Sequence, residues 1–424
     1  MKLISSFTFI LLSLTMQAQL VFDDYFIDRT MRFDFVLAGN STSTKVYPVS
    51  VREEPFWGGS LKNLTDRFGY GNFRYEVYDA ATDSLIYSKG FCTLYQEWQT
   101  TAEAKSMERV FHEVATFPFP KNKVNFVLSI RGRDGLFSKL YETSIDPASY
   151  FISREKPESA LASRIYGSGD PHTSLDIAFI AEGYTREEMG KFRSDVKRLA
   201  DILFNELPFD KYKEHINIWA VEAPSQESGT DVPGEGIYVN TALNASYYTF
   251  NIDRYLTTQD IGEVNDYAAA APHDQIIVLI NSPRYGGGGV YNYYSAVTSD
   301  HPLTPKVLTH EFGHGFAGLA DEYYSSEVAY EEFYPLDVEP WEPNITTNVN
   351  FESKWKRLIA KSVPVPTPNN KKYIGVTGLF EGGGYSAKDI YRPSFDCRMK
   401  SNQADSFCEV CQRAIEAMIL FYIE

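Results

Sequence analysis

The sequence lacks any excess of positive charge. Its 424 residues include 40 lysines and arginines against 56 aspartates and glutamates, which gives a formal net charge of −16. Nucleic acids and anionic membrane surfaces attract basic proteins and repel acidic ones. Neither is therefore expected as a main partner, and the negative charge is expected to serve solubility.

Long apolar runs are also scarce, and the one that stands out is at the N-terminus. Lys2 precedes the mainly apolar residues 3–15, and Ala18 is the expected last residue before cleavage. This arrangement is typical of a secretory signal peptide over residues 1–18. No cysteine follows the run, so no lipid anchor is expected, and the run is short for a membrane span. The sequence predicts an exported protein, located in the periplasm, at the cell surface or outside the cell.

Cysteine is rare, with four residues in the chain. Cys92 stands alone, whereas Cys397, Cys408 and Cys411 lie close together near the C-terminus. In an oxidising compartment these three are expected to form one structural disulfide, with the other thiols buried. A zinc site built from them would require a fourth ligand, and the neighbouring sequence shows none.

The first part of the mature chain, residues 19–160, is predicted to be a β-sandwich that serves as an accessory domain. Its segments alternate apolar and polar residues and are separated by glycine, asparagine and aspartate, as half-buried antiparallel strands are. The expected strands are 31–39, 45–53, 72–80, 84–91 and 123–132. No group of reactive residues is found in this part, which favours a binding or positioning role.

From residue 165 to residue 424 the pattern changes to strands that alternate with helices. Short apolar runs at 174–184, 215–223 and 274–282 predict buried strands. Between the first two, Thr185 is the expected N-cap of a long amphipathic helix. Alternation of this kind indicates a mixed α/β sheet, so the fold class is mixed and the domain boundary is expected near residues 150–170.

The segment TPKVLTHEFGHGFAG within this second domain is predicted to be a helix. Thr304 is the expected N-cap, Pro305 suits the first helical position, and Gly318 ends the helix. His310 and His314 are four residues apart, so both imidazoles project from the same helix face.

These two histidines enclose Glu311 in the motif HExxH. The motif is typical of zinc peptidases, because two imidazoles on one helix face bind zinc and the glutamate beside them takes a proton from the attacking water. The sequence therefore predicts Zn²⁺ as cofactor, His310 and His314 as metal ligands, and Glu311 as the general base.

A catalytic zinc needs a third protein ligand, and none of the seven histidines lies downstream of His314. The ligand must therefore be a carboxylate or come from upstream. Gly318 can turn the chain back so that "GLAD" delivers Asp321, with the adjacent Glu322 as second candidate. Glu331 or Glu332 on a second helix is the alternative, but three prolines follow shortly and disfavour a long helix there.

The stretch HEFGHGFAGLADEY resembles the signature of the M64 family of metallopeptidases, whose eponymous member is described as an IgA peptidase. Further similar stretches are DIAFIAEGYT, FNELPFDKYKEHINIWAVEAPSQESG, NSPRYGGGGV and CRMKSNQADSFCEVC, so the resemblance covers roughly residues 165–424. The N-terminal region resembles the accessory domain that often precedes this catalytic domain. The resemblance implies a protein or peptide substrate, and immunoglobulin is suggested by it alone.

This family is placed with the metzincins, which implies a twisted sheet, a zinc helix, a glycine turn and a Met-turn. The metzincin pattern is HExxHxxGxxH/D, and here Gly318 and Asp321 are both displaced by one residue. Met399 is the candidate for the methionine that underlies the histidines without binding zinc.

The segment SPRYGGGGVYNYYS, residues 282–295, places four glycines after a buried strand. No Lys-Ser/Thr follows, so it is not a phosphate loop. It is predicted either to form a sheet edge that pairs with an extended peptide substrate or to be a surface loop. The tyrosines considered for oxyanion stabilisation are Tyr293, Tyr294, Tyr323 and Tyr324, of which Tyr323 is selected.

The leading functional hypothesis is a secreted zinc-dependent endopeptidase. The alternatives are a zinc hydrolase that acts on a non-peptide bond and a cell-surface binding or adhesion protein with a non-catalytic zinc site. The presence of Glu311 disfavours the adhesion hypothesis, because a site that has lost its activity has no reason to keep the base.

Overall fold

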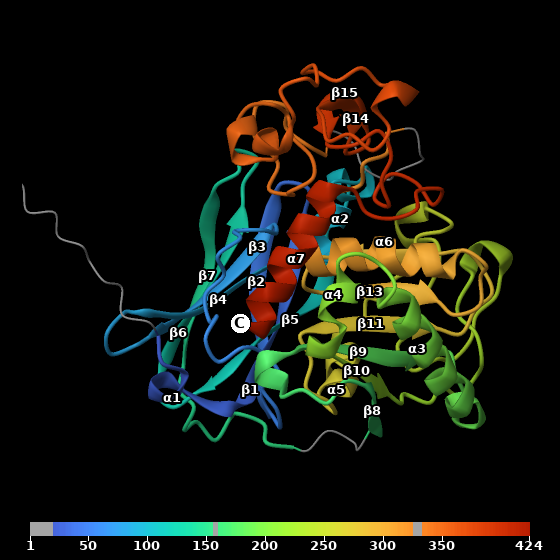
Figure 1. Cartoon of the computed structure of the whole chain (residues 1–424). Coiled ribbons are helices and arrows are strands. Elements are labelled where there is room, and N and C mark those ends of the chain that lie inside the picture. The colour runs from blue at the N-terminus through green and yellow to red at the C-terminus, as the bar shows by residue number, and fades with distance from the viewer. Residues whose placement is uncertain (1–19, 156–159, 325–332) are drawn as a thin grey trace, which may run out of the picture.

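A computed structural model of the chain describes residues 20–155, 160–324 and 333–424 (Figure 1). The predicted signal peptide and Ala18 lie outside the described residues. Within them, a β-rich N-terminal part lies beside a C-terminal part that contains a separate, mixed sheet. No helix in the described ranges is both long and apolar enough to span a bilayer.

The N-terminal part contains two antiparallel sheets. One has the strand order β2-β1-β5, and the other has the order β4-β3-β6-β7. The strands are β1 (Phe26–Asn40), β2 (Ser43–Glu54), β3 (Phe73–Asp79), β4 (Leu85–Phe91), β5 (Arg109–Pro120), β6 (Val124–Arg131) and β7 (Phe137–Ile145). The ring centroids of Phe33 in β1 and Phe126 in β6 are 4.9 Å apart, so the inner faces of the two sheets pack on one another. The prediction of a β-rich N-terminal region is confirmed.

Two strands of this part, β5 and β7, were not predicted from the sequence. In β5 the inward-facing position 113 is a glutamate, which is fully buried and interrupts the apolar alternation. In β7 no residue before Ile145 is fully buried, because this strand forms the edge of its sheet. Neither strand therefore shows the period-two pattern on which strand prediction depends.

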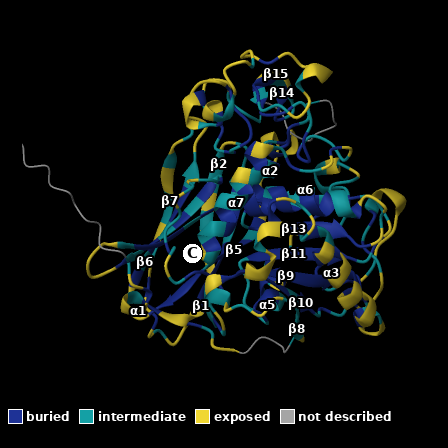
Figure 2. Ribbon diagram, viewed as in Figure 1, coloured by how far each residue is buried: buried dark blue, intermediate teal, exposed yellow. Residues whose placement is uncertain are grey.

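The C-terminal part is built on a six-stranded sheet with the order β12-β13-β11-β9-β10-β8. Its four central strands are parallel, and the edge strands β8 and β12 are antiparallel to their neighbours. The bounds are β8 (Ala162–Tyr166), β9 (Leu175–Glu182), β10 (Ile216–Val221), β11 (Gln275–Ile280), β12 (Gly287–Val290) and β13 (Tyr294–Thr298). The prediction of a mixed sheet is confirmed, and Figure 2 shows its central strands buried.

Four of the described helices contact strands of this sheet, and the first two helices of the chain contact strands of the N-terminal part. The helix bounds are α1 (Phe22–Tyr25), α2 (Leu94–Gln99), α3 (Met189–Leu203), α4 (Phe209–Tyr212), α5 (Ile261–Ala268), α6 (Thr304–Ala317) and α7 (Glu409–Ile423). Helix α5 contacts both β9 and β5, and buried apolar residues of the two parts form one continuous core. Because they share a core, the two parts are held in fixed positions against each other.

The two helix starts that were predicted have different outcomes. Thr185 caps a short turn that leads into α3, and together with Glu188 it forms a capping box. At α6 the prediction is wrong by one residue, since the N-cap is Leu303 and Thr304 is the first helical residue. The Thr304 hydroxyl donates a 2.9 Å hydrogen bond to the carbonyl oxygen of Thr298, so it is not available to cap the helix.

The chain after α6 is mostly irregular and returns to the sheet domain through α7. A short hairpin of β14 (Phe380–Gly383) and β15 (Ser386–Arg392) lies above the start of α7 in Figure 1. Helix α6 ends as predicted at Gly318, whose φ of +60° is left-handed. The N–H groups of Gly318 and Leu319 return to the carbonyls of His314 and Gly313, and this turn redirects the chain beneath the helix.

Candidate metal centre

Three side chains from α6 and from the segment after it meet at one point. His310 Nε2 lies 3.1 Å from His314 Nε2, and Asp321 Oδ1 lies 3.1 Å and 3.3 Å from these two nitrogens. A tetrahedral ion with bonds of about 2.0–2.1 Å holds its ligand atoms about 3.3–3.4 Å apart. The triangle therefore has nearly the dimensions of one face of a tetrahedral metal site.

The hydrogen bond made by Nδ1 of each imidazole determines the tautomer of that ring. His310 Nδ1 lies 3.0 Å from the carbonyl oxygen of Arg398, and His314 Nδ1 lies 2.5 Å from that of Leu319. A carbonyl oxygen only accepts, so each Nδ1 must carry a proton and donate it. Each Nε2 in the neutral ring then presents a lone pair, as metal-binding histidines do.

The donor set consequently fits a cation. Two nitrogen lone pairs and a carboxylate oxygen converge within 3.3 Å of one another, and all three side chains are largely buried. Burial alone would lower the pKa of His314, but the Asp321 carboxylate outweighs it and raises that pKa to about 9. Burial would likewise raise the pKa of Asp321, yet the two imidazoles hold it well below its ordinary value. The site thus favours positive charge at its centre.

Asp321 is held by a residue that the sequence did not indicate. The Tyr385 hydroxyl donates a 2.6 Å hydrogen bond to Asp321 Oδ2, which leaves Oδ1 facing the histidines. Outer hydrogen bonds of this kind orient metal ligands. The two residues are 64 positions apart in the sequence, and no local pattern connects them.

We expect Tyr385→Phe to weaken metal binding at this site by about 10–100-fold, because Asp321 would lose the hydrogen bond that orients its carboxylate. Competition with a chelator of known affinity measures the change. Tyr391→Phe is a matched control, since this tyrosine lies on the same hairpin and is not part of the site. Unchanged affinity in Tyr385→Phe would show that the hydrogen bond has no role in metal binding.

The other candidate third ligands do not join the triangle. Glu322 follows Asp321 directly but points elsewhere, and its Oε1 lies 3.0 Å from Asn344 Nδ2 and 3.3 Å from Cys411 Sγ. Glu331 and Glu332 lie outside the described residues. Among the described candidates the structure therefore brings Asp321 to the histidines and places Glu322 away from them.

Glu311 lies in the same cleft, against the glycine-rich strand β12. A Cβ atom at Gly287 would come within 2.9 Å of Glu311 Oε1, and one at Gly289 within 2.2 Å of the Glu311 carbonyl oxygen. Glycines are therefore required for α6 to approach the strand this closely. Burial raises the pKa of Glu311 above its ordinary value, which suits a group that must accept a proton.

The glycine-rich segment forms the edge strand that was one of its two predicted conformations. Strand β12 ends the mixed sheet, and Gly287 exchanges hydrogen bonds with Arg254 and Leu256 on its outer side. In an antiparallel pair, alternate residues point their backbone groups outward, so Gly289 is the next residue to do so. The edge nearest Glu311 is therefore a short one centred on Gly289.

Met399 lies directly beneath α6. It is fully buried, and a Cβ atom at Gly313 would come within 2.8 Å of its sulfur. Gly313 lies between His310 and His314 on the helix, so the methionine supports the turn that carries both histidines. The backbone carbonyl of Met399 also accepts a 2.8 Å hydrogen bond from the N–H of Glu322.

Of the four tyrosines considered as oxyanion donors, only Tyr323 lines the cleft around the histidines. Tyr294 instead bonds the backbone of Thr258, and Tyr324 packs on Gly382. Burial, and then the charge of Asp321, raises the pKa of Tyr323 well above its ordinary value, so its hydroxyl keeps its proton and can donate a hydrogen bond. Arg254 also lines the cleft and adds a cation that the sequence did not indicate.

The cleft is not formed by the C-terminal part alone. Asn72, Gln96 and Glu97 from the N-terminal part lie on its wall together with Trp341, whose indole N–H donates a 3.1 Å hydrogen bond to Asn72. This contribution could not be predicted from the sequence, because these polar residues resemble any exposed residues of a sandwich domain.

Comparison with known families agrees with this arrangement. Residues 164–375 and 369–419 match the family model described as IgA Peptidase M64. Residues 21–142 match the model described as Peptidase M64 N-terminus. A search of curated proteins found no match to the sequence.

Proposed function

The chain belongs to the M64 family of peptidases, and on this premise we propose that it is a zinc-dependent endopeptidase with Glu311 as general base. The observation that supports this most is the triangle of His310, His314 and Asp321, which has nearly the size of a tetrahedral zinc face. Two imidazoles and one carboxylate are a ligand set that zinc accepts, with a fourth position left for water or substrate.

In the proposed mechanism, the three side chains would hold the ion and Glu311 would move the proton. Bound zinc lowers the pKa of water and polarises the carbonyl that is attacked. Glu311 takes a proton from the attacking water and passes it to the leaving amine. Tyr323, which keeps its proton, and Arg254 are the proposed donors to the oxyanion, since both line the same cleft.

An extended peptide is the proposed substrate. The outward N–H and C=O of Gly289 offer a short sheet edge beside Glu311, and a peptide paired there would present its backbone to the metal centre. Residues of the N-terminal part on the cleft wall would then contact its side chains and contribute to selectivity. Only the family description suggests immunoglobulin as a substrate.

We also propose a metzincin-like organisation and export of the protein. The left-handed turn at Gly318 and the buried Met399 beneath α6 support the first proposal, with the turn displaced by one residue from the metzincin pattern. The basic and apolar N-terminal residues support the second. The negative charge supports a protein substrate over nucleic acid.

One experiment tests the proposed function directly. The purified protein is incubated with a diverse peptide library before and after removal of metal by a chelator, and then again with one metal restored at a time. We expect cleavage of internal peptide bonds that is lost on chelation and recovered with Zn²⁺. Cleavage that persists in the chelated, metal-free protein would overturn the proposal.

A further inference from the structure

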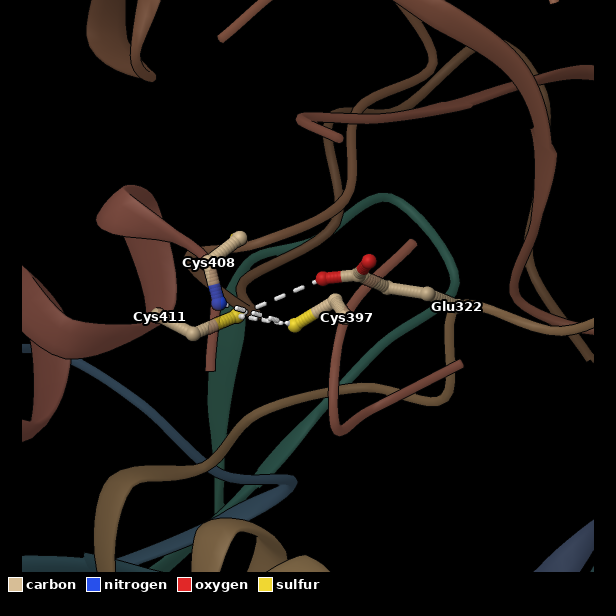
Figure 3. Close-up of side chains that lie close together, drawn as sticks. All are labelled: Glu322, Cys397, Cys408 and Cys411. Carbon is tan, nitrogen blue, oxygen red and sulfur yellow. Dashed lines mark hydrogen bonds between the residues drawn. The ribbon is translucent and has the colours of Figure 1, made fainter. Parts of the chain in front are cut away.

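A second group of metal-ligating side chains lies outside the centre described above. Glu322, Cys397, Cys408 and Cys411 bring four ligand atoms within 4.8 Å of one another, and all but Cys408 are fully buried (Figure 3). In the sequence Glu322 is 89 positions from Cys411, so it could not be recognised as the fourth ligand that the cysteines require.

The spacings in this group match a zinc site. Cys397 Sγ lies 3.7 Å from Cys411 Sγ, and Cys411 Sγ lies 3.3 Å from Glu322 Oε1. With Zn–S bonds of about 2.3 Å and Zn–O bonds of about 2.0 Å, tetrahedral geometry places two sulfurs about 3.8 Å apart and a sulfur and an oxygen about 3.5 Å apart. Both distances agree with these values to within about 0.2 Å.

Backbone groups near these sulfurs can stabilise negative charge on them. Cys408 is the N-cap of the 15-residue helix α7 and Cys411 is in its first turn, so both lie at the positive end of the helix dipole. The backbone N–H of Cys408 also donates a 3.2 Å hydrogen bond to Cys397 Sγ. A Cys-x-x-Cys pair at a helix start is a spacing that structural zinc sites use.

A disulfide would explain fewer of these contacts than a bound metal ion would. None of the four cysteines, all of which lie in the described residues, forms a disulfide in the structure, which differs from the sequence-based expectation. A bond between Cys397 and Cys411 would leave the third thiol unused and the Glu322 carboxylate buried beside it. Glu322 Oε2 has no hydrogen-bond partner among the described residues, and a buried carboxylate oxygen is costly to leave without a partner.

We propose that Glu322, Cys397, Cys408 and Cys411 form a second, structural zinc site. The thiols release their protons to solvent as their sulfurs bind Zn²⁺, and no oxidation or reduction is involved. Asn344 orients the carboxylate through its 3.0 Å hydrogen bond. Arg392 and Lys400 lie close enough to Glu322 for their positive charges to offset the excess negative charge of the ligand set.

This second site holds together the two segments that support the catalytic centre. Glu322 is bonded through its peptide group to Asp321, and its N–H binds the carbonyl of Met399. Cys397 is followed by Arg398, whose carbonyl accepts the hydrogen bond that orients His310. An ion bound to both Glu322 and Cys397 therefore fixes the distance between the chain segment that carries Asp321 and the one that carries Met399.

Metal content in a variant that lacks the first centre tests this inference without any need for activity. In the full-length His310→Ala/His314→Ala double variant we expect one zinc per chain, against two in the wild type. X-ray absorption at the zinc edge should show three sulfur neighbours and one lighter atom. The residues of the second site are unchanged in this variant, so a negative result cannot be attributed to their replacement.

Cysteine variants provide the matched comparison. In the double-histidine background, Cys411→Ser is expected to remove the remaining zinc, whereas Cys92→Ser replaces another buried cysteine and should retain it. An intact mass lower by two hydrogen atoms in the absence of reductant would instead establish a disulfide and overturn the inference. Zinc without sulfur neighbours, or no zinc in the folded double-histidine variant, would overturn it as well. None of these outcomes decides whether the protein is a peptidase.

Discussion

Replacing Glu311 with glutamine is expected to lower kcat/KM for peptide cleavage by about 10²–10⁴-fold while the bound zinc stays in place. The physical reason is that glutamine keeps the size of the side chain and its position against Gly287 but cannot accept a proton. None of the three proposed ligands is altered, so zinc content should remain that of the wild type. Steady-state kinetics on one cleaved library peptide, together with metal analysis of the same sample, measure both quantities.

The result separates the general-base role from a structural one. Glu187→Gln removes the same charge from an exposed position and should leave cleavage unchanged. The pH profile gives an independent readout, since the acidic limb of kcat/KM should disappear with the carboxylate. If Glu311→Gln retains wild-type turnover, another group accepts the proton and the proposed mechanism is wrong.

Replacing Asp321 with alanine is expected to remove both metal and activity from the first centre. The two imidazoles would remain, but a structural or catalytic zinc needs at least three protein ligands. The loss in affinity should exceed the roughly 10–100-fold that changes outside the ligand set produce. Zinc content is expected to fall by one equivalent per chain, and cleavage is expected to fall to the rate of the metal-free protein.

The outcome also tests which of two neighbouring carboxylates serves the first centre. Asp210→Ala, at an exposed position on α4, controls for the loss of an aspartate in general. Glu322→Gln is informative beside it, because we expect that variant to lose the second ion and to retain His310, His314 and Asp321 as ligands. Unchanged zinc affinity in Asp321→Ala would show that the third ligand has been assigned incorrectly.

Local sequence patterns were sufficient to predict helix α6 and the turn that follows it. Spacing by four residues places His310 and His314 on one face, and Gly318 adopts the left-handed conformation that allows Asp321 to return to them. The start of the helix was misplaced by one residue because Thr304 donates to a strand carbonyl instead of accepting from the helix. Such a competition between two partners for one hydroxyl is decided by tertiary structure.

The long-range contacts made by Asp321 and Glu322 could not be predicted from local patterns. Tyr385 reaches Asp321 over 64 positions, and Glu322 reaches Cys411 over 89, so neither pair leaves a periodic pattern. One signal was available for Glu322, since neighbouring side chains in an extended segment point to opposite sides. If Asp321 faces the histidines, Glu322 must face away from them, toward whatever lies behind. Which residues lie on that other side depends on the tertiary structure and cannot be read from the local sequence.

The adjacency of Asp321 and Glu322 also restricts how this chain can change in length. Each carboxylate reaches its own set of partners because the segment from Gly318 has one fixed number of residues. An inserted or deleted residue in this turn would shift by one position which side chains point to each side of the segment, so that the carboxylates would face the wrong partners. Insertions should therefore be tolerated in exposed surface loops and selected against between residues 318 and 322, even though no side chain there would be lost.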